Sequence, residues 1–376
     1  MKKDEQIRIA IAGGGTGGHL FPALNLGKAI KNTWNAQLLF FGTIRGIEKD
    51  VIPRAGEDII FLPVRGFRRK ITLENILTLY HLWRSIAISK KALRRFNPHL
   101  VLGTGGYVMG PVLKAAVKMG IPIVIQEQNS YPGLTTRMLA KKAEYIFLAY
   151  EEAKQYLPKQ AKTIITGNPI SLPPVKTGKR EARKIFELHQ NKLTILVLGG
   201  SQGAENINRA VMSIVRTTKD QKNVQWLWQT GKNNFIKWIG RVAAEKIKNV
   251  KVVPFIREMF KAYGAADLVV CRGGAMTLSE LMAMGKPAVI VPNPYSPADH
   301  QYKNAQVLAK HGAALVVRDN ANLTDNLQQT LNRLLAEQDK IQRMAKNMKS
   351  LYPGDSVAKI LQKIAELLQQ KGVSST

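Results

Sequence analysis

The sequence predicts an α/β protein built from two doubly wound, Rossmann-like domains that face each other across a cleft. Apolar strand-like runs alternate with amphipathic helical stretches along the whole chain, which is typical of parallel sheets covered by helices. A glycine loop follows the first strand of each half, and residues 9–18 (IAIAGGGTGG) align without a gap on residues 195–204 (ILVLGGSQGA). Because ligands of such sheets bind beyond the carboxyl ends of the strands, we expect both loops to border the cleft.

Each predicted strand is a short apolar run that leads into a turn or a helical stretch. The runs are residues 7–12, 37–42, 99–103 and 122–126 in the first half, and 193–200, 266–271 and 286–292 in the second. Residues 167–179 are rich in proline and glycine and indicate an interdomain connection. We therefore expect domains at residues 1–166 and 167–350, and a last helix at about 355–370 that packs across the interdomain region near the first domain.

Length and composition indicate a soluble globular protein. The 376 residues give room for two ordinary domains, and 45% of them are hydrophobic and 22% charged. No apolar run approaches the roughly 20 residues that span a bilayer, and the first residues lack the apolar region of a signal peptide. The single cysteine, Cys271, excludes an internal disulfide and is expected to be a small buried hydrophobe. The sequence therefore predicts a protein of the reducing cytosol.

The formal net charge of +30 predicts a surface that favours polyanions. Nucleic acid, phosphates and anionic lipid all fit this charge, so the charge alone does not choose among them. The sequence has no zinc-ligand spacing, no aromatic RNA-binding signature and no lysine–arginine block of the nucleic-acid type. A nucleic-acid-binding protein is therefore an alternative without a motif, and we expect no nucleic acid partner.

The segment of residues 271–305 has the features of a nucleotide-sugar site. An apolar strand runs into Gly273 and Gly274, which let the backbone approach a ligand before a helix begins at Ala275. The start of a helix offers unpaired N–H groups and a partial positive charge, which suits a diphosphate. Glu280, on the same helix, can accept two hydrogen bonds from a vicinal diol such as that of ribose. An ordinary polar helix face is the alternative interpretation of Glu280.

The first glycine loop matches the dinucleotide fingerprint at Gly13, Gly15 and Gly18. That fingerprint also needs an acidic residue at the tip of the second strand to bind the ribose. Here the second strand ends at residues 40–43 (FFGT) without an acid, and Glu48 comes later, in the following helix. A nicotinamide-dependent oxidoreductase is therefore disfavoured. The loop is followed instead by His19, where a strand gives way to a helix.

Six motifs in register give the chain a specific resemblance. They are GGGTGGH at 13–19, GTGGYVMGP at 103–111, EQN at 127–129, GNP at 167–169, GGSQGA at 199–204, and the segment 271–305. In this order they resemble the MurG family, the peripheral membrane N-acetylglucosaminyltransferases of peptidoglycan synthesis, over nearly the whole chain. The resemblance implies the GT-B glycosyltransferase architecture. It also implies transfer of N-acetylglucosamine from UDP-N-acetylglucosamine to lipid I (undecaprenyl-diphospho-N-acetylmuramoyl-pentapeptide), which forms lipid II through a β-1,4 bond with inversion.

The resemblance also implies which residues bind the substrates. In the second domain, the donor would be bound by Ser201 at the phosphate, by the Ile256 backbone at the uracil, by Gly273, Gly274, Ala275, Met276, Thr277 and Leu278 at the diphosphate, by Glu280 at the ribose, and by His300, Gln301 and Asn304 at phosphate or sugar hydroxyls. From the first domain, Thr16, Gly17, Gly18 and Asn129 would complete the cleft.

Two positions depart from the family pattern. Family members often carry an arginine shortly after the GNP motif, and here Ile170, Ser171 and Leu172 follow instead. The contact of Ser171 with the uracil end of the donor is thereby put in doubt. Met276 stands where leucine or another aliphatic residue is commoner, and this exchange conserves volume.

Inverting transfer needs a base for the acceptor hydroxyl and a stabilised leaving diphosphate. His19 is the first candidate for the base because an unperturbed imidazole titrates near pH 6.5. Glu127 is the rival, and a purely structural role is the alternative for each. No Asp-x-Asp triplet is present, so no metal is implied. We expect no cofactor, since UDP-N-acetylglucosamine is a substrate and glycine-loop amides and helix N-termini can stabilise the diphosphate.

A basic and apolar stretch predicts contact with a membrane surface. Residues 65–95 contain nine basic residues and one acid, Glu74. Ile76, Leu79, Tyr80 and Trp83 lie at helical spacing, and Arg68, Arg69 and Lys70 precede them. Each basic residue near anionic headgroups contributes about 1 kcal/mol. An ordinary core helix with a basic outer face is the alternative.

We therefore expect a peripheral enzyme at the cytoplasmic side of a bacterial plasma membrane. Its expected partners are UDP-N-acetylglucosamine, the undecaprenyl-linked acceptor, anionic phospholipid and other cell-wall synthesis proteins. A related glycosyltransferase that acts on another lipid acceptor, such as a diacylglycerol, or uses another nucleotide-sugar is the closest alternative. A non-catalytic regulator that binds a nucleotide-sugar is a further one.

Overall fold

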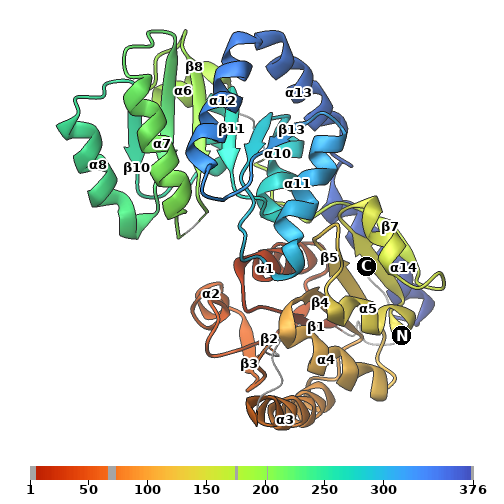
Figure 1. Ribbon diagram of the computed structural model, residues 1–376. Helices are drawn as coiled ribbons and strands as arrows, with labels where there is room; N and C mark the ends of the chain where they lie inside the picture. The colour runs from red at the N-terminus through yellow and green to blue at the C-terminus, as the bar shows by residue number, and fades with distance from the viewer. Residues whose placement is uncertain (1–5, 67–72, 174–176, 201, 374–376) are drawn as a thin grey trace. The chain divides into compact units, whose positions relative to one another are not determined.

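The chain divides into two units, each with its own parallel sheet (Figure 1). The computed structural model describes residues 6–66, 73–173, 177–200 and 202–373. Unit 1 contains Met1–Ser171 and Pro353–Thr376, and unit 2 contains Leu172–Tyr352. The GNP motif thus belongs to unit 1, whereas the expected boundary followed residue 166. The reason is local hydrogen bonding: Asn168 Oδ1 accepts from Gln126 Nε2 at 2.9 Å, and Asn25 Nδ2 donates to the Pro169 carbonyl at 2.8 Å.

Unit 1 is built on a seven-stranded parallel sheet of order β3-β2-β1-β4-β5-β6-β7. The strands are β1 (Arg8–Gly13), β2 (Gln37–Gly42), β3 (Asp58–Phe61), β4 (Leu100–Gly105), β5 (Ile123–Glu127), β6 (Tyr145–Leu148) and β7 (Thr163–Ile165). The order reverses between β1 and β4, and ligands of open parallel sheets bind at such a switch point, beyond the carboxyl ends of the strands.

Helices cover both faces of this sheet. They are α1 (Gly17–Trp34), α2 (Glu48–Arg54), α3 (Leu73–Phe96), α4 (Gly106–Lys118), α5 (Leu134–Leu139), η1 (Ala140–Lys142), η2 (Glu151–Tyr156) and α14 (Ser356–Gln370). Ile360 and Ile364 of α14 are fully buried in the same cluster as Ile9 and Ile11 of β1. The last helix therefore completes the core of unit 1, although it follows the whole of unit 2 in the sequence.

Unit 2 repeats this plan with a six-stranded parallel sheet of order β10-β9-β8-β11-β12-β13. The strands are β8 (Leu193–Leu198), β9 (Val224–Gln229), β10 (Val250–Val253), β11 (Leu268–Cys271), β12 (Ala288–Ile290) and β13 (Ala314–Val316). The helices are α6 (Lys179–Ile185), α7 (Glu205–Thr217), η3 (Lys232–Asn234), α8 (Phe235–Ala244), α9 (Met259–Ala265), α10 (Ala275–Met284), η4 (Pro297–Asp299), α11 (His300–Lys310), α12 (Leu323–Ala336) and α13 (Gln338–Ser350). The predicted fold class, two doubly wound α/β domains, is confirmed.

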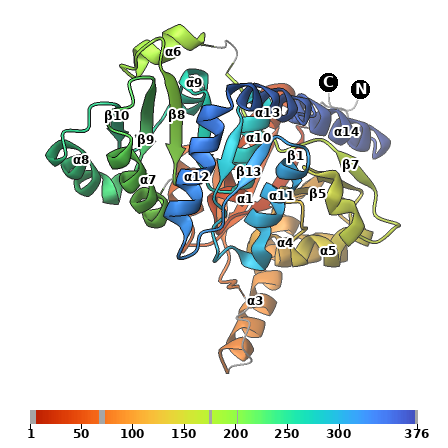
Figure 2. The ribbon, with the colours of Figure 1, turned by 45° about the horizontal axis from the view of Figure 1, so that its top comes forward.

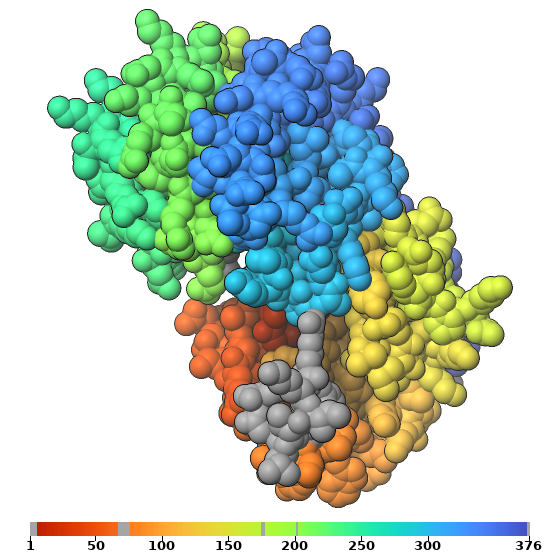
Figure 3. All heavy atoms as spheres, in the orientation of Figure 1, coloured from red at the N-terminus to blue at the C-terminus, as the bar shows by residue number. Residues whose placement is uncertain are grey.

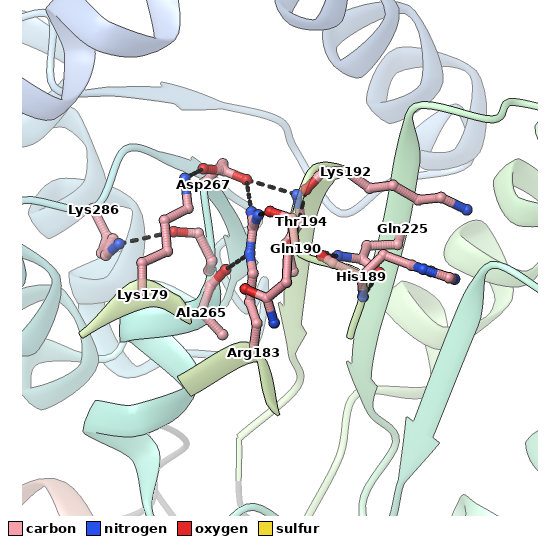
Figure 4. A network of polar contacts seen from close by, with 11 residues as sticks. Lys179, Arg183, His189, Gln190, Lys192, Thr194, Gln225, Ala265, Asp267 and Lys286 are labelled. Atoms are coloured by element: carbon pink, nitrogen blue, oxygen red, sulfur yellow. Dashed lines mark hydrogen bonds and ion pairs between the residues drawn. The ribbon is translucent and has the colours of Figure 1, made fainter. Parts of the chain in front are cut away.

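A cluster of ionic and polar contacts fixes α6 to the amino ends of β8 and β11 (Figure 4). Asp267 Oδ2 accepts from Arg183 Nη2 and from the Thr194 backbone N–H, both at 2.7 Å, and Oδ1 pairs with Lys179. Nearby, burial lowers the pKa of Lys286 to about 8. This cluster lies at the edge of the sheet opposite to the carboxyl ends, so Asp267 has a structural role in anchoring the start of unit 2.

Candidate functional site

Five loops of unit 2 lie at the carboxyl edge of its sheet, where ligands of such sheets bind. They follow β8, β9, β10, β11 and β12 in turn. The predicted donor residues of unit 2 all lie on these loops or on the helices that follow them. Ser201, in the loop after β8, lies outside the described residues.

The turn between β11 and α10 brings the backbone close to α11. A Cβ atom at Gly273 would lie 2.5 Å from the Gln301 carbonyl oxygen, so only glycine fits there, whereas Gly274 is open. The N-cap residue of α10 is Gly274, which has no side chain to cap the helix. Met276 and Thr277 are partly exposed in its first turn, beside the buried Ala275. The amino end of α10 thus has space in front of it for an anionic ligand.

Leu278 differs from the other residues of this predicted set. Its side chain is fully buried, and its backbone N–H donates to the Gly274 carbonyl at 3.0 Å. Leu278 therefore holds the helix on the core rather than offering a group to a ligand.

Arg272, which the sequence reasoning passed over, braces this turn. Its Nη1 atom donates to the carbonyls of Val291, at 3.1 Å, and Pro292, at 3.3 Å. Its Nη2 atom pairs at 2.8 Å with Asp319, whose other oxygen accepts from Asn206. The arginine therefore links the turn after β11 to the ends of β12 and β13. The position of Arg272 inside the segment 271–305 was the sequence signal for a role at the site, but its partner Asp319 lies outside that segment.

Gln229, at the end of β9, connects two further loops. Its Nε2 atom donates to the Gly200 carbonyl at 3.1 Å, and its Oε1 atom accepts from the Ile256 backbone N–H at 2.9 Å. The N–H of Ile256 is thus engaged within the protein, so a contact of this residue with uracil falls to its carbonyl. The sequence signal for Gln229 was a polar residue that ends a buried strand.

Glu280 is partly buried on α10 and faces α9. Its Oε2 atom accepts a hydrogen bond from the Tyr263 hydroxyl at 2.8 Å. Burial raises the pKa of Glu280 from 4.5 to about 7, and the Tyr263 hydrogen bond opposes this shift. A carboxylate that is half buried at the ligand edge, with no ion pair among the described residues, is uncommon on an ordinary polar helix face.

Three predicted residues at the start of α11 differ in their surroundings. The Nδ1 atom of His300, which is partly exposed, contacts the Pro297 carbonyl at 2.7 Å. The Oε1 atom of Gln301 accepts from the Asn293 N–H at 2.9 Å, which shapes the loop after β12. Asn304 is fully buried. Of the three, His300 is the best placed to meet a ligand.

The loop before this helix contains two non-glycine residues in the left-handed region, Ala298 (φ 53°) and Asp299 (φ 54°). Such a backbone costs free energy and persists only where the surrounding structure holds it. Asp299 is held by Arg318 at 3.3 Å, and Arg318 in turn stacks over the Tyr302 ring at 3.2 Å from its centroid. Asp299 thus stabilises the loop.

In unit 1, His19 lies where the loops after β1 and β4 meet. Its Nδ1 atom contacts Thr16 Oγ1 at 3.1 Å, and its carbonyl accepts from Thr104 Oγ1 at 2.8 Å. A Cβ atom at Gly105 would lie 2.5 Å from the Cδ2 atom of the imidazole. The glycines of the GTGG motif therefore make room for the His19 ring at the switch point of the sheet. Gly17 and Gly18 form the first turn of α1, and Gly18 is exposed, as is Thr16.

Glu48 organises the first glycine loop, a role that the sequence reasoning missed. Its carboxylate is fully buried and accepts from the Gly15 N–H at 3.1 Å and from the Thr43 N–H at 2.9 Å and Oγ1 at 3.0 Å. The dinucleotide fingerprint requires an acid at the tip of the second strand. Here the acid is Glu48 instead, at the start of α2, and its side chain bonds to the glycine loop. Because this carboxylate already accepts hydrogen bonds from protein groups, it cannot bind a ribose.

Replacing Glu48 by glutamine is expected to lower the free energy of unfolding by about 1–3 kcal/mol, because the amide NH₂ opposes donors that are buried and lose their acceptor. Urea unfolding measures this loss. Asp50→Asn is the matched control, since Asp50 is exposed on the same helix and should change stability little. Equal stability of the two variants would show that the Glu48 contacts contribute nothing.

Glu127, the rival base, holds the loop that follows β5. Its Oε2 atom accepts from the Gly133 N–H at 3.0 Å and from Thr136 Oγ1 at 2.7 Å, and its Oε1 atom accepts from the Asn129 N–H at 3.1 Å. Burial raises its pKa above 4.5 while these hydrogen bonds oppose the rise. Both carboxylate oxygens accept hydrogen bonds from the protein, so the geometry favours a structural role for Glu127 over that of a base. In this role Glu127 positions Asn129.

The EQN and GNP motifs, far apart in the sequence, form one buried network. Gln126 donates to Asn168 Oδ1 at 2.9 Å, and Asn168 Nδ2 donates to the Gln128 carbonyl at 3.2 Å. Gln128 Nε2 in turn donates to the Thr104 carbonyl at 2.7 Å, beside His19. Ser171 ends unit 1 as an exposed residue. Two of the six motifs thus support the loop that accommodates His19.

The described ranges contain neither a membrane-spanning helix nor a metal-binding cluster. No helix there is long and apolar enough to cross a membrane. Within the same ranges, no group of three or more His, Cys, Asp or Glu side chains could hold a metal ion.

Comparisons with known proteins agree with the six motifs. The model of the glycosyltransferase family 28 N-terminal domain matches residues 9–148, and that of the family 28 C-terminal domain matches residues 194–364. A protein of Caldanaerobacter subterraneus subsp. tengcongensis is 39% identical over 360 residues, which is 95% of this chain and 98% of the relative. A protein of Bacteroides fragilis is 40% identical over 370 residues, which is 97% of each chain.

Both relatives are named UDP-N-acetylglucosamine--N-acetylmuramyl-(pentapeptide) pyrophosphoryl-undecaprenol N-acetylglucosamine transferase. Among solved structures, the crystal structure of Acinetobacter baumannii MurG matches with a TM-score of 0.77 and 27% identity, over 97% of this chain and 99% of that one. The chain therefore belongs to glycosyltransferase family 28 and, within it, to the MurG family of N-acetylglucosamine transferases.

Proposed function

We propose that this chain transfers N-acetylglucosamine from UDP-N-acetylglucosamine to lipid I and so forms lipid II, the reaction for which its relatives are named. The observation that carries the proposal is the site at the carboxyl edge of unit 2. There the amino end of a helix that begins with the Gly273–Gly274 turn and the carboxylate of Glu280 lie on one short helix, α10. This pairing fits a ligand with a diphosphate and a vicinal diol, and a UDP-sugar has both.

The donor would bind with its diphosphate at the amino end of α10 and its ribose at Glu280. The helix dipole, equivalent to about half a positive charge at this end, favours the negative charge that grows on the diphosphate as the sugar leaves. We propose that this stabilisation takes the place of a divalent metal. His300, at the start of α11, would add a hydrogen bond to the phosphate or the sugar.

The acceptor hydroxyl would be activated in unit 1 by His19. The attacking oxygen forms a bond to C1 of the sugar, the bond from C1 to the diphosphate oxygen breaks, and the acceptor proton passes to the imidazole. Attack on the face opposite the diphosphate inverts C1 and gives a β product from an α donor. Thr16 at Nδ1 and the space made by Gly105 fix the ring, so Nε2 is the atom that we assign to the proton.

The membrane face of the enzyme would be α3. Large apolar side chains, among them Ile76 (64% exposed) and Trp83 (71% exposed), lie on its outer side together with Leu77, Leu79 and Tyr80. Its inner side carries the fully buried Ser85 and Ser89, whose hydroxyls bond to carbonyls of the preceding turn. The amino-terminal turns of α3 project from unit 1 (Figure 2) and lie on the molecular surface (Figure 3, orange).

The same helix packs Ile86, Ile88 and Leu93 on the core of unit 1. Its exposed apolar side chains are therefore additional to a core face, and such a patch suits a lipid surface. Arg68, Arg69 and Lys70, the basic part of the predicted patch, lie outside the described residues. The exposed Arg84 on α3 can supply charge beside the apolar side chains. A lipid-linked acceptor would then reach the enzyme at this surface, and we propose that the surface is the cytoplasmic leaflet of the plasma membrane.

The double substitution of Ile76 and Trp83 by serine is expected to weaken binding to vesicles of anionic phospholipid tenfold or more, since each buried apolar side chain contributes about 1.5–3 kcal/mol. Vesicle sedimentation measures the binding. Turnover of a water-soluble, short-chain acceptor should stay unchanged. Ile236→Ser is the control, because Ile236 is even more exposed, at 78%, on α8 of unit 2. Undiminished vesicle binding by the double variant would exclude α3 as the membrane face.

The choice of acceptor and donor tests the proposed function itself. The purified chain is incubated with anionic vesicles and UDP-N-acetylglucosamine, and either lipid I or a diacylglycerol is supplied. We expect transfer to lipid I alone, and slower transfer from UDP-glucose or UDP-galactose. Transfer to the diacylglycerol would support the alternative of another lipid acceptor, and donor binding without any transfer would support a regulator.

A further inference from the structure

Tyr263 is a fully buried side chain that meets the proposed donor site. It lies on α9 and donates its hydroxyl to Glu280 Oε2 on α10 at 2.8 Å. Its ring packs edge-on against Phe260, with the ring centroids 6.1 Å apart. A ring so enclosed has few rotamers open to it, so the position of its hydroxyl is fixed by the core of unit 2.

The direction of this hydrogen bond is set by the surroundings. Burial and the charge of Glu280 raise the pKa of Tyr263 well above its usual value, so the phenol keeps its proton and donates. One lone pair of Glu280 Oε2 is thereby occupied. Within the described part of the chain, Oε1 of Glu280 has no hydrogen-bond partner, and this carboxylate makes no ion pair.

Several charged and titratable groups of the elements around Glu280 are engaged elsewhere, among them Lys261 of α9, which pairs with Glu258. On β11, burial raises the pKa of Cys271 to about 12, so this thiol is neutral. Arg272 pairs with Asp319. Lys349 of α13 donates to the Ala283 carbonyl, near the far end of α10, and His300 of α11 contacts the Pro297 carbonyl. Tyr263 is thus the group that orients the carboxylate.

We propose that Tyr263 is a positioning residue that makes donor binding selective for ribose: by holding one oxygen of Glu280, it fixes the plane of the carboxylate so that both hydroxyls of a ribonucleotide can donate to it. This inference rests on the proposed function, in which Glu280 binds the ribose. A carboxylate that rotates freely about its last side-chain torsion could turn to bind a single hydroxyl equally well. A fixed carboxylate instead favours the diol of ribose over a 2′-deoxyribose.

The same geometry has a consequence for pH. Hydrogen bonds from a diol favour the charged carboxylate, so donor binding should lower the pKa of Glu280 from its value of about 7. Affinity should therefore increase as pH rises from 6 to 8 and then level off. Removing the Tyr263 hydroxyl deletes a hydrogen bond that stabilises the charged form, which should move this pH dependence upward.

The experiment compares wild type, Tyr263→Phe and Glu280→Gln by calorimetric titration with UDP and 2′-deoxy-UDP at pH 8. Wild type should prefer UDP by about 10- to 100-fold, the effect of one hydrogen bond to a charged group. Tyr263→Phe should reduce the preference to a few-fold, and Glu280→Gln should also reduce it. Tyr156→Phe, which removes an exposed hydroxyl from unit 1, should leave the preference unchanged.

A second titration follows the affinity for UDP-N-acetylglucosamine between pH 6 and 9, because its diphosphate has no proton that titrates there. In wild type, the rise in affinity should have its midpoint at a pH near or below 7. In Tyr263→Phe the midpoint should lie at a higher pH, and in Glu280→Gln the affinity should not rise with pH. A rise that persists in Glu280→Gln would belong to another group, such as His300, and would contradict the assignment to Glu280.

The outcomes separate the inference from the proposed function. If wild type binds neither UDP nor UDP-N-acetylglucosamine, the proposed function fails. If wild type prefers UDP and Tyr263→Phe keeps both the preference and the pH midpoint, the proposed function stands and the inference is wrong. A Tyr263→Phe variant that loses UDP and 2′-deoxy-UDP to the same extent has a structural defect only, which also overturns the inference.

Discussion

Replacing His19 by alanine is expected to lower kcat for N-acetylglucosamine transfer by about 10²- to 10⁴-fold, while the dissociation constant of UDP-N-acetylglucosamine stays nearly unchanged. The imidazole is the group that we assign to the acceptor proton, and we propose that the donor binds to the other unit. The backbone at this position should survive the change, because Thr104 bonds to the His19 carbonyl rather than to the ring.

Single-turnover kinetics with saturating donor measures the chemical step, and equilibrium titration measures donor affinity. His189→Ala is the control, since His189 is exposed at the opposite edge of the sheet of unit 2 (Figure 4). An undiminished rate for His19→Ala would assign His19 a structural role. Glu127→Gln would then be the next variant to measure, although its two oxygens are engaged by the loop that follows β5.

Replacing Glu280 by alanine should weaken the binding of UDP-N-acetylglucosamine by about 100-fold or more at pH 8. Two hydrogen bonds to a charged group are lost, each with a contribution of about 1.5–3 kcal/mol. At saturating donor, kcat should fall much less, because the interaction with the ribose is the same in the ground state and the transition state.

Glu258→Ala provides the matched control for this variant. Glu258 is an exposed carboxylate in front of α9 and pairs only with Lys261 among the described residues. Its removal should leave donor affinity unchanged. If Glu280→Ala binds the donor as tightly as wild type, the ribose is held by another group and the proposed orientation of the donor in unit 2 is wrong.

The fold could be predicted from the sequence because its signals are local. Continuous apolar runs such as residues 193–198 become strands that are buried on both faces, and each glycine loop directly follows a strand. The turn of Gly273 and Gly274 and the carboxylate of Glu280 also lie on one short segment. Spacing along a single helix was therefore enough to identify them as candidates.

The supporting residues could not be predicted because their partners are distant in the sequence. Glu48 meets the loop at Gly15 only because α2 begins beneath it, 33 positions away. Gln229 reaches Gly200 and Ile256 from a strand between them, and Arg272 pairs with Asp319 across five intervening elements of the sequence. The pairing of Tyr263 with Glu280 depends likewise on how α9 packs against α10.

The product of one reaction shows whether the chain is an inverting N-acetylglucosaminyltransferase. The chain is incubated with UDP-N-acetylglucosamine and a short-chain analogue of lipid I, and the lipid product is analysed by mass spectrometry and by proton NMR of its anomeric signal. We expect an acceptor that gains one N-acetylhexosamine in β linkage, with one UDP released for each sugar transferred. UDP release without change in the acceptor, or an α-linked product, would contradict this expectation.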